Sequence, residues 1–146
     1  MLFVDRALDG MLRIVEELGD EAVNFRPDFP DANSPYGILT HCIGVVNHWI
    51  GNVIADRGIP RDRPAEFVAT GTFADLKEAV RACRARLAAD LVIVDGLDSP
   101  ASPPPSRYRP AGGPAEWTQG AVLIHMYEEL AQHHGQMELT RDILLY

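Results

Sequence analysis

Apolar residues recur every three or four positions along four segments of the chain, which is the spacing of amphipathic helices. The segments run from about Phe3 to Leu18, Pro35 to Asp56, Thr72 to Leu91 and Pro114 to Leu144. No segment alternates between apolar and polar residues at the period of two that marks a half-buried strand. We therefore expect an all-α protein: a four-helix bundle that forms a single domain over residues 1–146.

The connections between these helices differ in length and character. Gly19 ends the first helix, Ser34-Pro35 is a start signal for the second, and Thr72 followed by Asp75 is typical of a capping box. Residues 59–71 (IPRDRPAEFVATG) are charged and lack a helical period, so we expect a loop there. Residues 95–114 are rich in proline and glycine and are expected to form a partly mobile surface loop. Two such long connections permit a crossover topology.

Composition excludes several classes of function. Thirteen basic against twenty-one acidic side chains give a net charge of -8, which argues against binding to nucleic acid. No apolar run reaches the ~18–20 residues of a membrane span, and the N-terminus lacks a signal-peptide pattern. We expect a cytoplasmic protein that does not associate with membranes. Cys42 and Cys83 lie on apolar helical stripes, so reduced core thiols are expected rather than a disulfide.

The stretch HMYEELAQHHGQ, residues 125–136, places three histidines and two glutamates in the last helix. At about 100° per residue, a buried stripe is defined by Leu123, Met126, Leu130, Met137 and Leu144. The same helical wheel puts Glu129 and His133 on the core-facing side and Glu128 toward solvent. His134 lies on the opposite flank of the stripe, and His125 lies beyond Glu129.

Glu129 and His133 are four residues apart, so their side chains lie together on one face of the helix. Burying a carboxylate beside an imidazole is costly unless both are satisfied. A divalent metal would satisfy them, and so would a Glu–His hydrogen bond without metal. Bundle metal sites draw ligands from facing helices. The second helix offers His41 and His48 on one side, and periodicity does not choose between them.

Three motifs carry a resemblance to a known family: SPYGILTHCIGVVNHWIG (residues 34–51), PRDRPAEF (residues 60–67) and LIHMYEELAQHHGQMELTRDILL (residues 123–145). In this order they resemble the DinB-like superfamily, and within it the mycothiol-dependent, thiol S-transferase-like branch. The resemblance covers nearly the whole chain. It implies a four-helix bundle with crossover topology and a divalent metal bound by His41, Glu129 and His133. Gln136 stands where a histidine is common in this branch.

The resemblance also implies a function. Two histidines and one carboxylate leave coordination positions open, the pattern of catalytic zinc, although nickel or iron could occupy the same set. We expect a metal-dependent enzyme that activates a low-molecular-weight thiol such as mycothiol, for S-transfer to a small electrophile or for its isomerisation or detoxification. The alternatives are a non-catalytic metal-binding stress-response bundle and a metal-dependent hydrolase. By analogy with related proteins, we expect a homodimer.

Other polar and aromatic residues have two interpretations each. Arg61 and Arg63 could bind an anionic group of the thiol or substrate, or they could pair with Asp62 or Glu66 and order the loop. Five further residues could line a pocket or contact the metal ligands, with ordinary packing as the alternative: His48, His125, Gln136, Trp49 and Trp117. His134 has the same two interpretations.

Overall fold

Helices are the only regular structure in residues 2–102, 104 and 117–146, the part of the chain that the computed structural model describes. The five α-helices are α1 (Leu2–Ala22), α2 (Pro35–Val46), α3 (Arg63–Val68), α4 (Phe73–Asp90) and α5 (Gln119–Leu145). A π-helix, η1 (Asn47–Ile54), continues α2, and a short 3-10 helix, η2 (Leu91–Ile93), continues α4. The prediction of an all-α bundle is confirmed.

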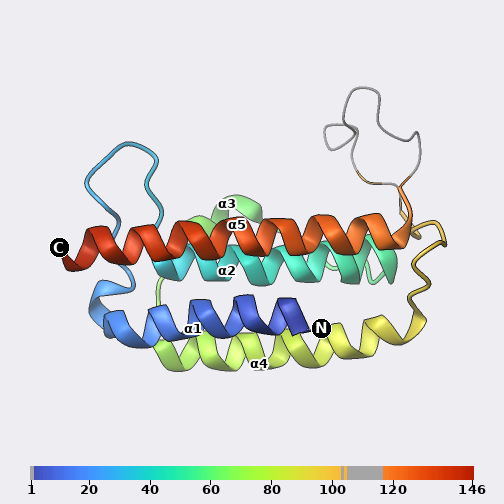
Figure 1. Cartoon of the computed structure of the whole chain (residues 1–146), viewed down its shortest axis with the longest axis horizontal. Coiled ribbons are helices and arrows are strands. Elements are labelled where there is room, and N and C mark those ends of the chain that lie inside the picture. Colours follow the sequence, from blue (N-terminus) through green and yellow to red (C-terminus); the bar gives the residue numbers. More distant parts are fainter. Residues whose placement is uncertain (1, 103, 105–116) are drawn as a thin grey trace.

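The four long helices form two layers, with α1 and α4 in one layer and α2 and α5 in the other (Figure 1). Along their lengths, α1 and α5 run in one direction and α2 and α4 in the opposite one. Among the four long helices, α1 and α2 both pack mainly against α4 and α5, so these two consecutive helices lie largely across the bundle from each other. The chain therefore crosses over between layers, which brings α2 and α5 together as antiparallel neighbours.

The core lies between the two layers and follows the stripe predicted on α5 in part, since Met126, Leu130 and Met137 are buried whereas Leu123 and Leu144 are half-buried. On α5 the buried apolar residues are Val122, Met126, Leu130 and Met137. On α4 they are Leu76, Val80, Cys83 and Leu87, and on α1 they include Leu8, Met11, Val15 and Leu18. Among the helices of the described ranges, none has the length and apolar character needed to cross a membrane.

Two element boundaries differ from the predictions. The first helix continues to Ala22, but Gly19 adopts a left-handed conformation (φ 72°, ψ 173°) that kinks it where an end was expected. The fourth helix was expected from Pro114. Residue 114 lies outside the described part, and α5 begins at Gln119 after the N-cap Thr118, whose hydroxyl accepts a hydrogen bond from the Ala121 amide at 3.2 Å.

The expectation of a loop over residues 59–71 was wrong, because this segment contains the short helix α3. Asp62 caps its N-terminus by accepting a hydrogen bond from the Ala65 amide at 3.1 Å, and Pro64 occupies its first turn. No residue of α3 is fully buried, which explains why no apolar period marks it in the sequence. Instead α3 is held by its cap and by packing against α2.

The packing between layers predicts a large difference between two leucines of α5. Leu130 has no exposed surface, whereas Leu139 is 67% exposed. Replacing Leu130 by alanine leaves a cavity between the layers and should lower the free energy of unfolding by about 2–5 kcal/mol. The matched Leu139→Ala variant should change it by less than about 0.5 kcal/mol. Chemical denaturation of both variants measures the difference, and similar values would contradict this assignment of the core.

Candidate metal centre

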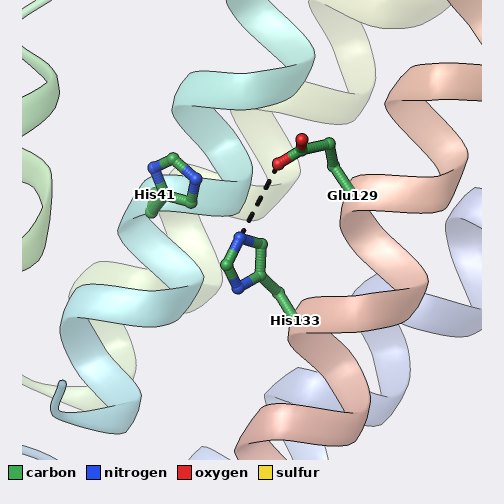
Figure 2. A group of neighbouring side chains, drawn as sticks. All are labelled: His41, Glu129 and His133. Carbon is green, nitrogen blue, oxygen red and sulfur yellow. Dashed lines mark ion pairs between the residues drawn. The ribbon is translucent and has the colours of Figure 1, made fainter. Parts of the chain in front are cut away.

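Three potential metal ligands converge between α2 and α5. His41 comes from the middle of α2, and Glu129 and His133 come from successive turns of α5 (Figure 2). Their ligand-type atoms all lie within 4.8 Å of one another. His133 Nε2 is 3.8 Å from Glu129 Oε2, and the rings of His41 and His133 meet edge to face with centroids 4.8 Å apart. The structure thus brings together the three residues that the family resemblance singled out.

A carboxylate from α3 holds the far side of the His41 ring. Glu66 Oε2 lies 2.8 Å from His41 Nδ1. The same carboxylate accepts two hydrogen bonds from Arg61, at 2.7 Å from Nε and 2.9 Å from Nη2. Burial would raise the pKa of Glu66, but the hydrogen bonds from His41 and Arg61 outweigh it and lower this pKa below its ordinary value. Glu66 is therefore ionised at neutral pH and can only accept hydrogen bonds.

The Glu66 contact determines which nitrogen of His41 faces the centre. Because Glu66 accepts, His41 Nδ1 carries the proton, and in the neutral ring Nε2 is left with its lone pair. His41 is only 1% exposed, and its Nε2 has no hydrogen-bond partner among the described residues. A buried imidazole nitrogen without a partner is unfavourable. A cation bound between α2 and α5 would satisfy it.

Two glycines of α2 allow α3 to approach closely enough for this contact. Gly37 and Gly44 are four residues before and three residues after His41, on the same face of α2. A β-carbon at Gly44 would collide with the Glu66 carboxylate, and one at Gly37 would lie 2.7 Å from the Phe67 carbonyl oxygen. With these positions free of side chains, Phe67 also stacks on the His41 ring, with centroids 4.3 Å apart.

His133 is oriented from within its own helix. Its Nδ1 lies 2.8 Å from Gln136 Oε1, an amide oxygen that can only accept, so Nδ1 donates and Nε2 is the nitrogen that faces Glu129. Burial is the main cause that lowers the pKa of His133, and the Gln136 hydrogen bond opposes it only in part. His133 is therefore neutral at neutral pH, the form that can coordinate a metal.

The donor set fits a divalent cation. It consists of two imidazoles, each held by a hydrogen bond at Nδ1, and one carboxylate. Ligands about 2.1 Å from a tetrahedral zinc ion lie about 3.4 Å apart, close to the 3.8 Å between His133 Nε2 and Glu129 Oε2. Histidine ligands usually donate their second ring nitrogen to a carboxylate or carbonyl-type oxygen, which is the role that Glu66 and Gln136 have here.

An aromatic cluster lies next to Glu129. The rings of Trp49 and Trp117 are nearly parallel with centroids 5.9 Å apart, and each meets His125 edge to face, at 4.6 and 5.3 Å. His125 Nε2 is 3.6 Å from Glu129 Oε1, so the two oxygens of Glu129 face different histidines. Trp49 belongs to η1, and π-helical turns are frequent at functional sites.

The remaining predicted residues lie around or away from this centre. His48 lines a cavity of about 270 Å³ with Asn47 and Asn52, on the side of α2 where Arg61 and Glu66 lie. The ring of His134 occupies the space beside Gly10 of α1, at a different helix interface.

The two arginines that were considered together have different surroundings. Arg61 forms its ion pair with Glu66, which is the structural alternative considered above. The Arg63 guanidinium carbon instead lies 5.2 Å from the centre of the Phe67 ring.

Glu66 and Phe67, which both contact His41, were not recognised from the sequence as part of the site. Glu66 appeared only as a possible partner of the neighbouring arginines. The signal that could have found both residues is the Asp62–Arg63–Pro64 start of a helix, since a cap followed by proline in the first turn predicts helical geometry for the next residues.

The chain also matches a known protein family. The sequence profile of the mycothiol-S-transferase family matches residues 1–144. The match spans nearly the entire chain, so the protein belongs to this family, which is DinB-like. Comparison with curated proteins gives no significant match.

The hydrogen bond between Glu66 and His41 predicts an effect on metal affinity. Glu66→Gln removes the negative charge behind His41 and leaves the charge of Arg61 uncompensated beside the centre, and it should weaken zinc binding about tenfold to hundredfold. Glu78→Gln makes the same charge change at an exposed glutamate of α4 that pairs with Arg81, and it should leave zinc affinity unchanged. Competition with a chromophoric chelator measures both dissociation constants. Equal zinc affinity in the two variants would show that Glu66 does not support the centre.

Proposed function

From the family membership and the geometry of the centre, we propose that this protein is a divalent-metal-dependent enzyme that activates a low-molecular-weight thiol for transfer to a small electrophile. Mycothiol is the proposed thiol and zinc the proposed metal, with nickel and iron as alternatives. His41, Glu129 and His133 are the proposed ligands. The observation that carries the proposal is the convergence of these residues from α2 and α5, with both imidazoles held at Nδ1.

The proposed chemistry needs a donor set that leaves room for the thiol. Three protein ligands leave at least one coordination position open, as in catalytic rather than structural zinc sites. When bound, a divalent cation lowers the pKa of a coordinated thiol, so that the nucleophilic thiolate is populated at neutral pH. Glu129 contributes one negative charge, and the two histidines contribute none. The protein set therefore leaves a positive charge to attract the thiolate.

The surrounding residues support a reaction protected from solvent. His41 is almost fully buried, and the side chains of Glu129 and His133 are 26% and 20% exposed. Trp49, Trp117 and His125 form an aromatic wall beside Glu129. Such a wall excludes water that would compete with the thiol and strengthens electrostatic interactions within the site. The role proposed for these three residues is to shield the centre.

The thiol in this proposal comes from outside the protein. Cys42 and Cys83 have no exposed surface. Burial raises the pKa of Cys42 far above its ordinary range, and Glu129 and Glu66 add to the effect. Burial likewise raises the pKa of Cys83 to about 11. Neither side chain supplies thiolate at neutral pH, so neither is suited to be the nucleophile.

We also propose that the protein is cytoplasmic, where low-molecular-weight thiols are kept reduced, and that it forms a homodimer. In support of self-association, a cavity of about 290 Å³ between α1, α4 and α5 has an almost entirely apolar lining, and Phe3 and Ile124 at its rim are 60% and 72% exposed. The non-catalytic bundle and the hydrolase remain the alternatives, and thiol binding separates both from the proposed function.

Thiol binding should depend on the metal ligands. By isothermal titration calorimetry, the dissociation constant of mycothiol should be at least ten times lower for the zinc-loaded protein than for the His133→Ala variant, since that variant lacks one zinc ligand. Glu128→Gln, which changes the exposed neighbour of Glu129, should bind mycothiol like the wild type. Zinc content is measured in the same samples. Equal thiol affinity with and without His133 would contradict thiol activation, and full zinc occupancy after replacing both Glu129 and His133 would refute the ligand assignment.

The buried cysteines predict slow alkylation of the folded protein. With excess iodoacetamide at neutral pH and no added thiol, mass spectrometry should find neither Cys42 nor Cys83 modified over a time that suffices for both in denaturant. A Cys42→Ala, Cys83→Ala double variant should retain thiol transfer activity if it remains folded by circular dichroism. Rapid labelling in the native state, or loss of activity in the folded double variant, would favour a protein thiol as nucleophile.

A further inference from the structure

Arg61 and Arg63 are two residues apart but have different partners. Arg61 donates two hydrogen bonds to Glu66. The same carboxylate also accepts a hydrogen bond from His41, so Arg61 and His41 together are its partners and Arg63 is not among them. Arg63 is exposed and forms no ion pair within the described part of the chain. Its guanidinium lies over the Phe67 ring, 5.2 Å from the centroid, which is a favourable cation–π distance.

Phe67 places this unpaired charge next to the centre. One ring contact joins Arg63 to Phe67, the next joins Phe67 to His41 at 4.3 Å, and the third joins His41 to His133 at 4.8 Å. Arg63 is thus within electrostatic reach of the proposed ligands.

Arg63 is a positive charge beside the centre that forms no ion pair among the described residues. Arg61 and Glu66 cancel each other. Glu129 and a bound thiolate together would cancel a divalent cation. Arg63 adds a positive charge beside this set, in a protein whose net charge is -8 and whose overall field repels anions. An anionic second substrate would need such a local cation, and the planar guanidinium matches a carboxylate.

We propose that Arg63 binds the carboxylate of an anionic electrophile and selects it over neutral electrophiles of the same reactivity. This inference rests on the proposed function and adds the chemical class of the second substrate. In the reaction, the thiolate sulfur forms a bond to the electrophilic carbon, the leaving group departs with its bonding electron pair, and the thiol proton passes to solvent. Arg63 takes no part in these bond changes and acts as a specificity-determining residue.

The test uses two electrophiles that differ in charge but react alike with thiols, iodoacetate and iodoacetamide. Zinc-loaded protein is assayed with mycothiol and each electrophile, and kcat/KM is corrected for the uncatalysed reaction. Arg63→Ala should lower the ratio of kcat/KM for iodoacetate to that for iodoacetamide about tenfold, and Arg63→Lys should restore part of it. Arg13→Ala removes the same charge from an exposed position of α1 and should leave the ratio unchanged.

The outcomes separate this inference from the proposed function. Turnover of iodoacetamide by the wild type with an unchanged ratio in Arg63→Ala would overturn the inference and leave the proposed function intact. An equal loss for both electrophiles, with a raised KM for mycothiol, would also overturn it, because Arg63 would then serve the thiol. Turnover of neither electrophile by the wild type would overturn both.

Discussion

The buried imidazole of His41 is the constraint on which the rest of the centre depends. A histidine inside an apolar helix needs a partner at each ring nitrogen, because an unsatisfied polar group in the interior is costly. At Nδ1 the partner is Glu66, whose half-buried carboxylate is neutralised by Arg61. Both partners come from the segment around α3. The position of this six-residue helix thus follows from the requirements of one side chain on α2.

The crossover topology completes the arrangement. Because α2 is a direct neighbour of α5, the Nε2 side of His41 faces Glu129 and His133. A bundle in which α2 packed chiefly on α1 would present His41 to a helix with no histidine. The layer order and the donor set are therefore consistent with each other. The aromatic wall comes from the same pair of neighbours, since Trp49 extends from η1 toward His125 of α5.

The sequence predicted much of α5 but could not rank the histidines of α2. On α5, a regular period with a narrow apolar stripe separated Glu129 and His133 from Glu128, and their burial follows this order. In α2 the apolar arc is broad, so both His41 and His48 were at its edge. The helix also changes to wider π-helical turns at Asn47, and the rotation of 100° per residue no longer applies at His48. Family resemblance, rather than periodicity, selected His41.

The glycine at position 44 has a consequence for the history of this site. It gives the Glu66 carboxylate the volume that any side chain would fill. A lineage that acquires even a methyl group at position 44 must move or lose the carboxylate, and His41 then needs another partner. Positions 44 and 66, which are distant in sequence and different in chemistry, should therefore vary together among relatives. Their covariation would trace where this way of holding the histidine arose and where it was replaced.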